Sequence, residues 1–402
     1  MSSPRIDAAA LAAVPAHSPS AALRAEAATA ADLICRQAMG GEAYLSHVMR
    51  SEYGKIGFIL IPVSDVDLFK DKQRSLTAAL KGVELAAALG AKCVSFTGMI
   101  PAATDYARTI ASAVEMRAAE NPDLKGLQLT TGHAGVVAAF ALNIDSLLEF
   151  AGRRYPDERV AFVGLGSIGE GTARLMSNRR APRHIYLVDV EKKKSHLEGL
   201  KADLTRNSEI SPSQIDVVTV EAEQSLPADL YPNVSLILSA TSSPEVIDID
   251  ALAPGTLIVD DSFPLGYNTY KAVRRMQGPA DIMITIAGAF QGRAEFTLDH
   301  VPAGPDDPGL DLLRDILPRI ANPWPNCLTG CVYSAHLTPH FDLPETIGPA
   351  TADDAQRFYD TLRRHGFRGT PPYFFTFGME REDPIFSLEK PRPLPSSIVD
   401  KG

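Results

Sequence analysis

A glycine-rich turn between a strand-like run and a helix is the sequence feature that most constrains the fold. The run RVAFV is followed at once by GLGSIG (Gly164–Gly169) and then by residues with helical character. The first glycine permits a tight turn, the second lets a phosphate approach the backbone, and the third lets helix and strand pack closely. This order predicts a Rossmann unit whose helix N-terminus meets a pyrophosphate.

The residues around this turn alternate between short β-rich runs and helical or loop segments. The runs are RVAFVG, HIYLVD, QIDVVTV, VSLILSAT, GTLIVDDS and DIMITIAGA. Six such runs in alternation are typical of a doubly wound parallel sheet. We therefore predict an α/β protein with a Rossmann dinucleotide-binding domain over residues 156–300.

The cofactor preference depends on the end of the second run, where Asp189 stands. A carboxylate there hydrogen-bonds the adenosine ribose and repels a 2′-phosphate, which favours NAD(H) over NADP(H). Three lysines, Lys192 to Lys194, follow directly and could neutralise such a phosphate. The residues predicted to bind the cofactor are Gly164, Leu165, Gly166, Ser167, Ile168, Gly169, Asp189 and Thr241.

The rest of the chain predicts three further regions. Residues 1–30 are rich in Ala and Ser and are interrupted by prolines, so we expect a flexible arm without chemistry. Residues 31–155 contain KIGFILIPV, a helical run and AKCVSFTG, a βαβ pattern that predicts a second α/β domain for the substrate. Residues 301–402 form a C-terminal segment with helical character and a Pro-rich tail.

Composition excludes several classes of function. Lys and Arg number 39 against 49 Asp and Glu, a net charge of −10 that opposes binding to nucleic acid. Four scattered cysteines are too few for a disulfide framework, so a reducing compartment is the simpler expectation. Apolar runs long enough to cross a membrane are not apparent, and we expect a cytoplasmic protein.

Cys331 is the candidate nucleophile. It follows Gly330 in a segment with helical character, and a thiol at a helix N-terminus gains thiolate character from the helix dipole. Cys327 would share its helical face if the helix extended back that far. The alternative is that both are small core residues. A zinc site that also used His336 and His340 is disfavoured by the short spacing, so no metal is expected.

His133, in the segment TTGHAG, is the second candidate catalytic residue. It lies in a polar loop before a long helical run. An imidazole there could hydrogen-bond a substrate carbonyl or act as an acid toward an aldehyde oxygen. The alternative is local, because Thr130 and Thr131 are good helix-capping residues and the histidine could simply satisfy a backbone group.

Several segments occur in the order found in a known family of enzymes. They are AKCVSFTGMIPAAT, LTTGHAG, VAFVGLGSIGEGTARLM, SATSSPEVIDIDALAPGTLIVDDSFP, ITIAGA, NCLTGCVYSAHL and RRHGF. Together they resemble the long-chain acyl-(acyl-carrier-protein) reductases, over roughly residues 55 to 370. The resemblance implies NAD(P)H-dependent reduction of a carrier- or CoA-bound acyl thioester to an aldehyde, through a covalent thioester on Cys331. It favours NADP(H), and it implies an acyl carrier protein as a partner.

Two other functions remain open on the residues alone. A shikimate-type or hydroxy-acid dehydrogenase also joins a small α/β domain to a Rossmann domain and needs no cysteine. A non-catalytic dinucleotide-binding regulatory protein would carry the same glycine-rich turn. A homo-oligomer is compatible with each of these functions, and the sequence does not select an acyl-chain length.

Overall fold

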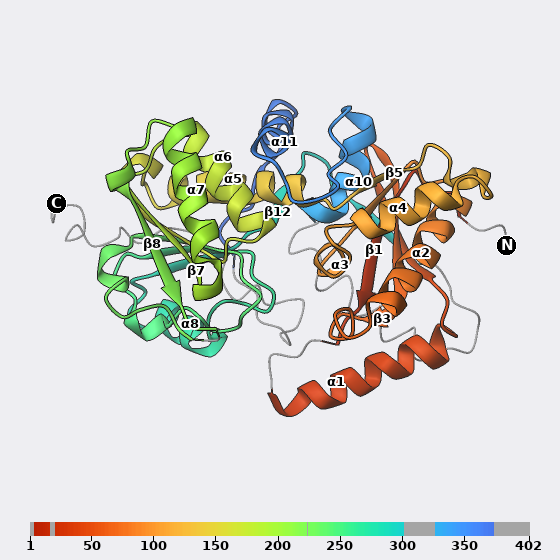
Figure 1. The fold of residues 1–402 in the computed structure, drawn as a ribbon, viewed down its shortest axis with the longest axis horizontal. Coiled ribbons are helices and arrows are strands. Elements are labelled where there is room, and N and C mark those ends of the chain that lie inside the picture. Colours follow the sequence, from red (N-terminus) through yellow and green to blue (C-terminus); the bar gives the residue numbers. More distant parts are fainter. Residues whose placement is uncertain (1–3, 17–20, 223, 301–325, 374–402) are drawn as a thin grey trace. The chain divides into compact units, whose positions relative to one another are not determined.

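The computed structural model describes residues 4–16, 21–222, 224–300 and 326–373. The chain divides into two compact units (Figure 1). Unit 1 comprises Met1–Val136 and Gln291–Phe367, and unit 2 comprises Val137–Phe290 and Arg368–Gly402. Each unit contains its own six-stranded sheet.

The sheet of unit 1 has the strand order β13-β2-β3-β1-β4-β5. Strands β3, β1, β4 and β5 run parallel, while β2 and β13 extend the β3 edge in antiparallel register. Helices α2 and α4 cover one face of this sheet (Figure 1). Its elements are β1 (Ala8–Val14), α1 (Ala21–Leu33), β2 (Tyr44–Ser51), β3 (Gly54–Ser64), α2 (Lys72–Ala88), β4 (Cys93–Phe96), α3 (Ile100–Ala103), α4 (Arg108–Arg117), β5 (Gln128–Thr130), β13 (Thr297–His300), β14 (Cys327–Thr329), α10 (Gly330–His340) and α11 (Ala352–Arg364).

The prediction of a flexible N-terminal arm over residues 1–30 is wrong for residues 8–14. These residues form β1, which lies between β3 and β4 in the sheet and is almost wholly buried. Its sequence AAALAAV contains few of the branched residues typical of strands, so it does not look like a strand. A strand covered on both faces needs no polar alternation, and small side chains let helices approach closely. Gly82 of α2 packs directly over Leu11 and Ile61.

The sheet of unit 2 has the order β11-β10-β9-β6-β7-β8, and all its neighbouring strands are parallel. This is the doubly wound order of the Rossmann fold, with the reversal of winding between β6 and β9. The predicted α/β class and the six predicted strands are confirmed. The elements are β6 (Arg159–Val163), α6 (Ser167–Arg179), β7 (His184–Val190), α7 (Lys194–Asn207), β8 (Ile215–Val220), β9 (Leu236–Ser239), β10 (Leu257–Asp260), α8 (Thr269–Gln277), β11 (Met283–Ile286), β12 (Ala289–Gln291) and β15 (Arg368–Gly369).

The unit boundaries differ from the predicted domain boundaries at both ends of the Rossmann domain. Helix α5 (His133–Phe150) starts in unit 1 and continues into unit 2, so the first boundary falls inside it and not near residue 155. Residues 327–367, which we expected in a separate C-terminal segment, supply β14, α10 and α11 to unit 1. The helical run LDLLRDILPRIA (310–321) of the expected C-terminal segment and the Pro-rich tail lie outside the described residues.

Helix α5 is the single described helix that is long and apolar enough to span a membrane. Its mean hydropathy is 1.2, although the sequence alone did not single out any apolar run of that length. Buried residues make up 78% of it, which is what a core helix of a globular domain shows. Its composition therefore reflects packing inside the protein.

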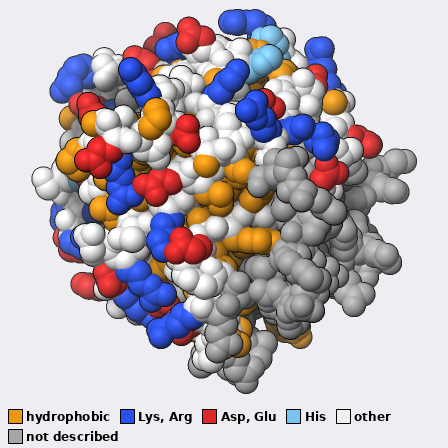
Figure 2. Space-filling model, turned by 90° about the vertical axis from the view of Figure 1, so that its right-hand side faces the viewer, with side chains coloured by type: hydrophobic (Ala, Val, Ile, Leu, Met, Phe, Trp, Pro, Cys, Tyr) orange, Lys and Arg blue, Asp and Glu red, His pale blue; other side chains and the backbone are white. Residues whose placement is uncertain are grey.

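Charges of both signs are distributed over the face shown in Figure 2. Lys and Arg side chains alternate there with Asp and Glu side chains, and apolar side chains gather near the centre. Nucleic-acid binding relies on a continuous basic surface. The described part of this face offers none.

Candidate functional site

The glycine-rich turn of unit 2 has the geometry that its sequence predicts. Gly164 has a positive φ of 81° and lies against Ala240 and Thr241 of the loop after β9. A Cβ on Gly169 would come within 2.0 Å of the Gly164 carbonyl oxygen, so only glycine allows α6 to pack this closely. At Gly166, by contrast, a Cβ would meet no atom of the described residues within 4 Å, apart from its own chain neighbours. The middle glycine therefore faces open space.

A pyrophosphate fits this turn on two grounds. Helix α6 begins at Ser167, and its N-cap Gly166 provides no side-chain cap for the first backbone N–H groups. These groups and the helix dipole together favour an anion. The turn also lies at the reversal of winding between β6 and β9, where ligands of doubly wound sheets bind. Gly164–Gly169 are thus arranged as a dinucleotide site requires.

Asp189 lies at the end of β7, as predicted, but its carboxylate already has several donors. It accepts hydrogen bonds from the backbone N–H of Leu165 at 2.8 Å and of Val190 at 2.8 Å. Lys193 Nζ lies 2.7 Å from the same carboxylate. Asp189 therefore braces the glycine-rich turn, and the lysine offsets its charge. The repulsion of a 2′-phosphate is weaker than the sequence suggested, so Asp189 does not decide between NAD(H) and NADP(H).

Thr241 follows β9, beside the glycine-rich turn. Its backbone N–H donates to Ser262 Oγ at 3.0 Å, and its carbonyl accepts from the N–H of Phe263 at 3.2 Å. Ser262 Oγ is also 2.8 Å from Ser239 Oγ. The loops after β9 and β10 are consequently tied together at the carboxyl ends of the strands. Thr241 lies where a bound dinucleotide would pass over the sheet.

A second group of candidate residues lies at the carboxyl ends of β4 and β5 in unit 1. Helices α5 and α10 meet there at their first turns, through glycines from both helices. A Cβ on Gly330 would lie 2.5 Å from the carbonyl oxygen of Gly135, and one on Gly132 would lie 2.6 Å from Cys331 Cα. The two helix N-termini are therefore in direct backbone contact. The starts of α5 and α10 are about 200 residues apart in the sequence but adjacent in the structure. The dipoles of the two helices both favour negative charge near their N-termini.

Cys331 is half-buried in the first turn of α10. The N-cap residue Thr329 does not cap the helix with its side chain, and the thiol donates to its Oγ1 over 3.6 Å. The hydroxyl of Ser95, at the end of β4, donates to the carbonyl oxygen of Cys331. The sulfur thus lies in the first turn of a helix that has no side-chain cap, and the Thr329 hydroxyl lies beside it.

His133 is the first residue of α5 and follows Gly132, which touches the Cys331 backbone. The predicted backbone capping is present, because the His133 N–H donates to Thr131 Oγ1 at 3.3 Å. Burial lowers the pKa of the His133 imidazole to about 4. The ring is therefore neutral near pH 7 and suits a hydrogen-bonding role better than that of a cationic acid.

The sequence alone did not reveal three residues that contact this group. Ser95 and Thr329 touch Cys331, and the ring of Tyr106 lies edge-on to the His133 ring at 5.8 Å. Tyr106 is the middle of three consecutive non-glycine residues with positive φ, a rare and strained conformation. Ser95 carried a usable signal, since it lies near the end of the predicted strand run AKCVSFTG, one residue before β4 ends at Phe96. The backbone of Tyr106 carried none.

Cys327 does not join Cys331 on one helical face. It lies in strand β14, fully buried, and burial raises the pKa of its thiol to about 12. This is the small core residue that the alternative interpretation described. Among the described residues, no group of three or more His, Cys, Asp or Glu side chains is placed to hold a metal ion.

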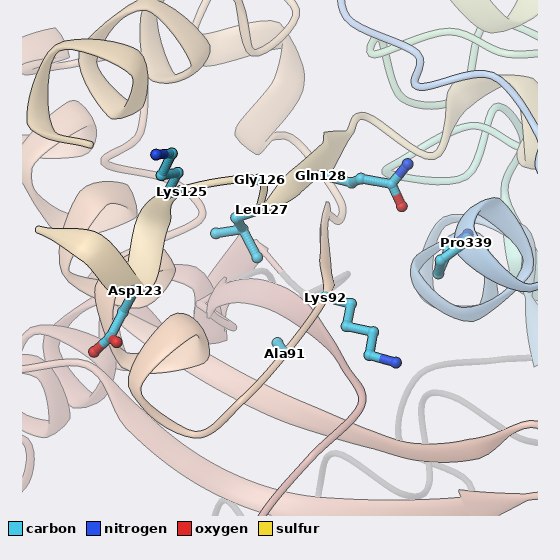
Figure 3. A pocket seen from close by; sticks show the side chains of 8 residues that line it. All are labelled: Ala91, Lys92, Asp123, Lys125, Gly126, Leu127, Gln128 and Pro339. Atoms are coloured by element: carbon cyan, nitrogen blue, oxygen red, sulfur yellow. The ribbon is translucent and has the colours of Figure 1, made fainter. Parts of the chain in front are cut away.

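A pocket lies at the opposite ends of the same strands, and Figure 3 shows its lining. Lys92 precedes β4 and Gln128 starts β5, so the pocket is at the amino ends of the parallel strands. Ser95 and Gly132, beside Cys331, mark the carboxyl ends. The pocket is therefore separate from the candidate catalytic residues, and its lining contains no cysteine, serine or histidine. Its lining residues are Ala91, Lys92, Asp123, Lys125, Gly126, Leu127, Gln128 and Pro339.

Burial of His336 on α10 predicts acid-sensitive folding. The side chain is 3% exposed, and burial lowers its pKa to about 4, against about 6.5 in an unfolded chain. Above pH 6.5 the ring is neutral in both states. Between pH 6.5 and 4 the unfolded chain takes up a proton that the native ring does not, so the free energy of unfolding falls by about 2–3 kcal/mol.

The measurement is urea unfolding of the wild type and of His336→Gln at pH 7, 5.5 and 4.5. We expect the variant to be less stable at pH 7, because packing is lost, and to lose less stability on acidification than the wild type. Parallel pH curves for the two proteins would contradict this origin of the acid sensitivity. His133 acts in the same direction and remains in both proteins.

No family model and no curated protein matches this chain. Among solved structures, pyruvate reductase of Chlamydomonas reinhardtii is 12% identical at a TM-score of 0.31, over 89% of this chain and 97% of that chain. Salmonella D-lactate dehydrogenase is 12% identical at a TM-score of 0.28, over 69% and 78%.

A dipicolinate synthase component from Bacillus halodurans is 15% identical at a TM-score of 0.30, over 47% of this chain. The match spans about half of that protein, 55% of its length. The likeness to these three structures concerns the fold alone. The Rossmann assignment of unit 2 rests on the strand order of this chain itself.

Proposed function

We propose that this protein is an NAD(P)-dependent oxidoreductase. The observation that carries the proposal is the turn Gly164–Gly169 at the reversal of winding of an all-parallel sheet. Its middle glycine faces open space, and the helix behind it is uncapped. Asp189, Lys193 and Thr241 flank the turn. These residues would hold a nicotinamide dinucleotide, which when bound supplies or accepts a hydride.

We further propose that the substrate is an acyl thioester and that Cys331 is the nucleophile. The support comes from unit 1, where two helix N-termini meet at Cys331 and Thr329 Oγ1 lies beside the sulfur. A half-buried thiol placed in this way differs from Cys327, whose pKa is raised by complete burial. The resemblance to acyl-(acyl-carrier-protein) reductases over residues 55 to 370 points to the same residue.

The residues of unit 1 suggest the following roles. The Cys331 thiolate attacks the carbonyl carbon of the thioester, the bond to the carrier sulfur breaks, and the carrier leaves as a thiol after taking up a proton. Backbone N–H groups at the two helix N-termini and the neutral His133 ring stabilise the oxyanion. A bound reduced nicotinamide dinucleotide would supply the hydride for the acyl carbon, and Cys331 would then leave as the thiolate when the aldehyde is released.

A second candidate is a dehydrogenase that acts on a hydroxy acid or a keto acid without a covalent step. The observation that favours it is His133, because a neutral imidazole in this position can hydrogen-bond a ketone or alcohol oxygen without any thiol. Two of the structures reported above, the pyruvate reductase and the D-lactate dehydrogenase, are named as enzymes of this class. The two candidates share the cofactor and differ in whether the cysteine is required.

One assay panel tests both candidates. NADH and NADPH oxidation is measured against acyl-CoA and carrier-bound acyl groups of graded length, and against pyruvate and larger 2-keto acids, with the product identified. We expect thioester-dependent oxidation with an aldehyde product. Turnover of keto acids alone would overturn the thioester proposal, and dinucleotide binding without turnover of any substrate would favour a regulatory protein. Location in the cytoplasm and an acyl carrier partner belong to the same proposal.

A further inference from the structure

A carboxyl group without a described partner lies at the carboxyl edge of the unit 2 sheet. Asp261 directly follows β10, and its backbone N–H donates to the Ser239 carbonyl at 2.8 Å. Within the described part of the chain, its side chain has no hydrogen bond and no ion pair. The side chain is partly buried, and the neighbouring Asp260 carboxyl adds charge of the same sign. A side chain in this position destabilises the fold unless a ligand uses it.

The surroundings of Asp261 are built to keep this carboxyl in place. Its Oδ1 lies against Gly288, after β11, where a Cβ would come within 2.3 Å and where φ is +85°. Asp260, in contrast, accepts hydrogen bonds from the N–H groups of Ser262 at 3.1 Å and Gly266 at 3.0 Å. The two adjacent carboxyls thus have different environments. Asp260 holds the loop, and Asp261 remains available.

The position of Asp261 relative to the glycine-rich turn suggests what it binds. The pyrophosphate site lies between β6 and β9, and the adenosine half of a dinucleotide extends toward β7, where Asp189 lies. The other half must then extend over the ends of β9, β10 and β11. We propose that Asp261 accepts a hydrogen bond from the nicotinamide-ribose half of the cofactor, either from the carboxamide N–H or from a ribose O–H. This inference rests on the proposed cofactor.

Burial raises the pKa of the Asp261 carboxyl to about 8, and the charge of Asp260 is a smaller cause in the same direction. Hydrogen-bond donors on a bound ligand compensate for lost hydration of such a group. Because the described residues offer Asp261 no such donor, we expect Asp261→Ala to be at least as stable to urea as the wild type. Residues that serve ligands at the expense of stability behave in this way.

The test is equilibrium binding of four ligands to the full chain. NADH carries the carboxamide and both riboses. The reduced 3-acetylpyridine analogue lacks the carboxamide N–H, ADP-ribose lacks the ring, and ADP lacks the ring and the second ribose. We expect Asp261→Ala to weaken NADH about tenfold and to leave ADP unchanged. The control is Asp229→Ala, which removes an exposed carboxylate of the same unit and should change none of the four affinities.

The ligand series separates the two donors. If the carboxamide is the donor, Asp261→Ala weakens NADH but not the acetylpyridine analogue or ADP-ribose. If the ribose is the donor, it weakens all three. Unchanged NADH affinity, or an equal loss for every ligand including ADP, would overturn the assignment of Asp261. A wild-type protein that binds none of the four ligands would overturn the proposed cofactor instead, so the two failures are distinguishable.

Discussion

Replacing Cys331 with alanine is expected to abolish the acyl-enzyme and to reduce thioester-dependent NAD(P)H oxidation by at least about 10³-fold. The reason is chemical. If the thiol forms the covalent bond to the acyl group, its neighbours Thr329 and Ser95 cannot replace it, because their hydroxyls are far weaker nucleophiles at neutral pH. Intact-protein mass spectrometry before NADH addition measures the acyl-enzyme directly.

Cys327→Ala is the matched control for this experiment. Its thiol is fully buried, and its pKa is raised to about 12, so it does not form an acyl-enzyme. We expect near wild-type turnover with a stability loss of about 1 kcal/mol from the small cavity. Iodoacetamide should inactivate the wild type and the Cys327→Ala protein alike, and an acyl thioester should protect both.

Retained turnover in Cys331→Ala would remove the thiol from the mechanism. If the variant also kept activity on 2-keto acids, the non-covalent dehydrogenase would become the better description, with His133 as the residue to test next. Equal losses in Cys331→Ala and Cys327→Ala would point to damaged packing around β14 and α10. Cofactor binding should survive in each variant, because the glycine-rich turn belongs to unit 2.

Much of unit 2 could be predicted because its determinants are local in sequence. A strand, a glycine-rich turn and a helix lie within about 20 residues, and each glycine has its own steric reason. The role of Asp189 was harder to predict, because its partners Leu165 and Lys193 depend on how the turn folds back. Asp261 was overlooked for a related reason, since its carboxyl packs against Gly288, 27 positions later.

Unit 1 was less predictable because its sheet uses strands from distant parts of the chain. Strand β1 has an alanine-rich sequence, and its strand character comes from pairing with β3 and β4. Strand β13 reaches the same sheet from beyond the Rossmann segment. The contact of Gly135 with Gly330 is also nonlocal. Cys331 was identifiable from its neighbours in sequence, but the second helix N-terminus beside it was not.

Two alanine substitutions in the glycine-rich turn distinguish an effect on ligand binding from an effect on stability. Gly166 has a φ of −81°, which alanine adopts without strain, and beyond its chain neighbours a Cβ there meets no described atom within 4 Å. Gly169 is different, because its Cβ would come within 2.0 Å of the Gly164 carbonyl oxygen. The first substitution therefore adds a methyl group to the ligand side of the turn, and the second forces strand and helix apart.

We expect Gly166→Ala to unfold within about 0.5 kcal/mol of the wild type and to bind NADH and ADP at least about 30-fold more weakly, because the methyl group occupies the approach of the pyrophosphate. Gly169→Ala should lose about 1–3 kcal/mol of stability as α6 shifts away from β6, with weaker binding as a consequence. Urea unfolding and calorimetric titration of both variants measure the two effects. Undiminished NADH binding by a fully folded Gly166→Ala protein would mean that the pyrophosphate does not cross this turn, and the dinucleotide proposal for unit 2 would fall with it.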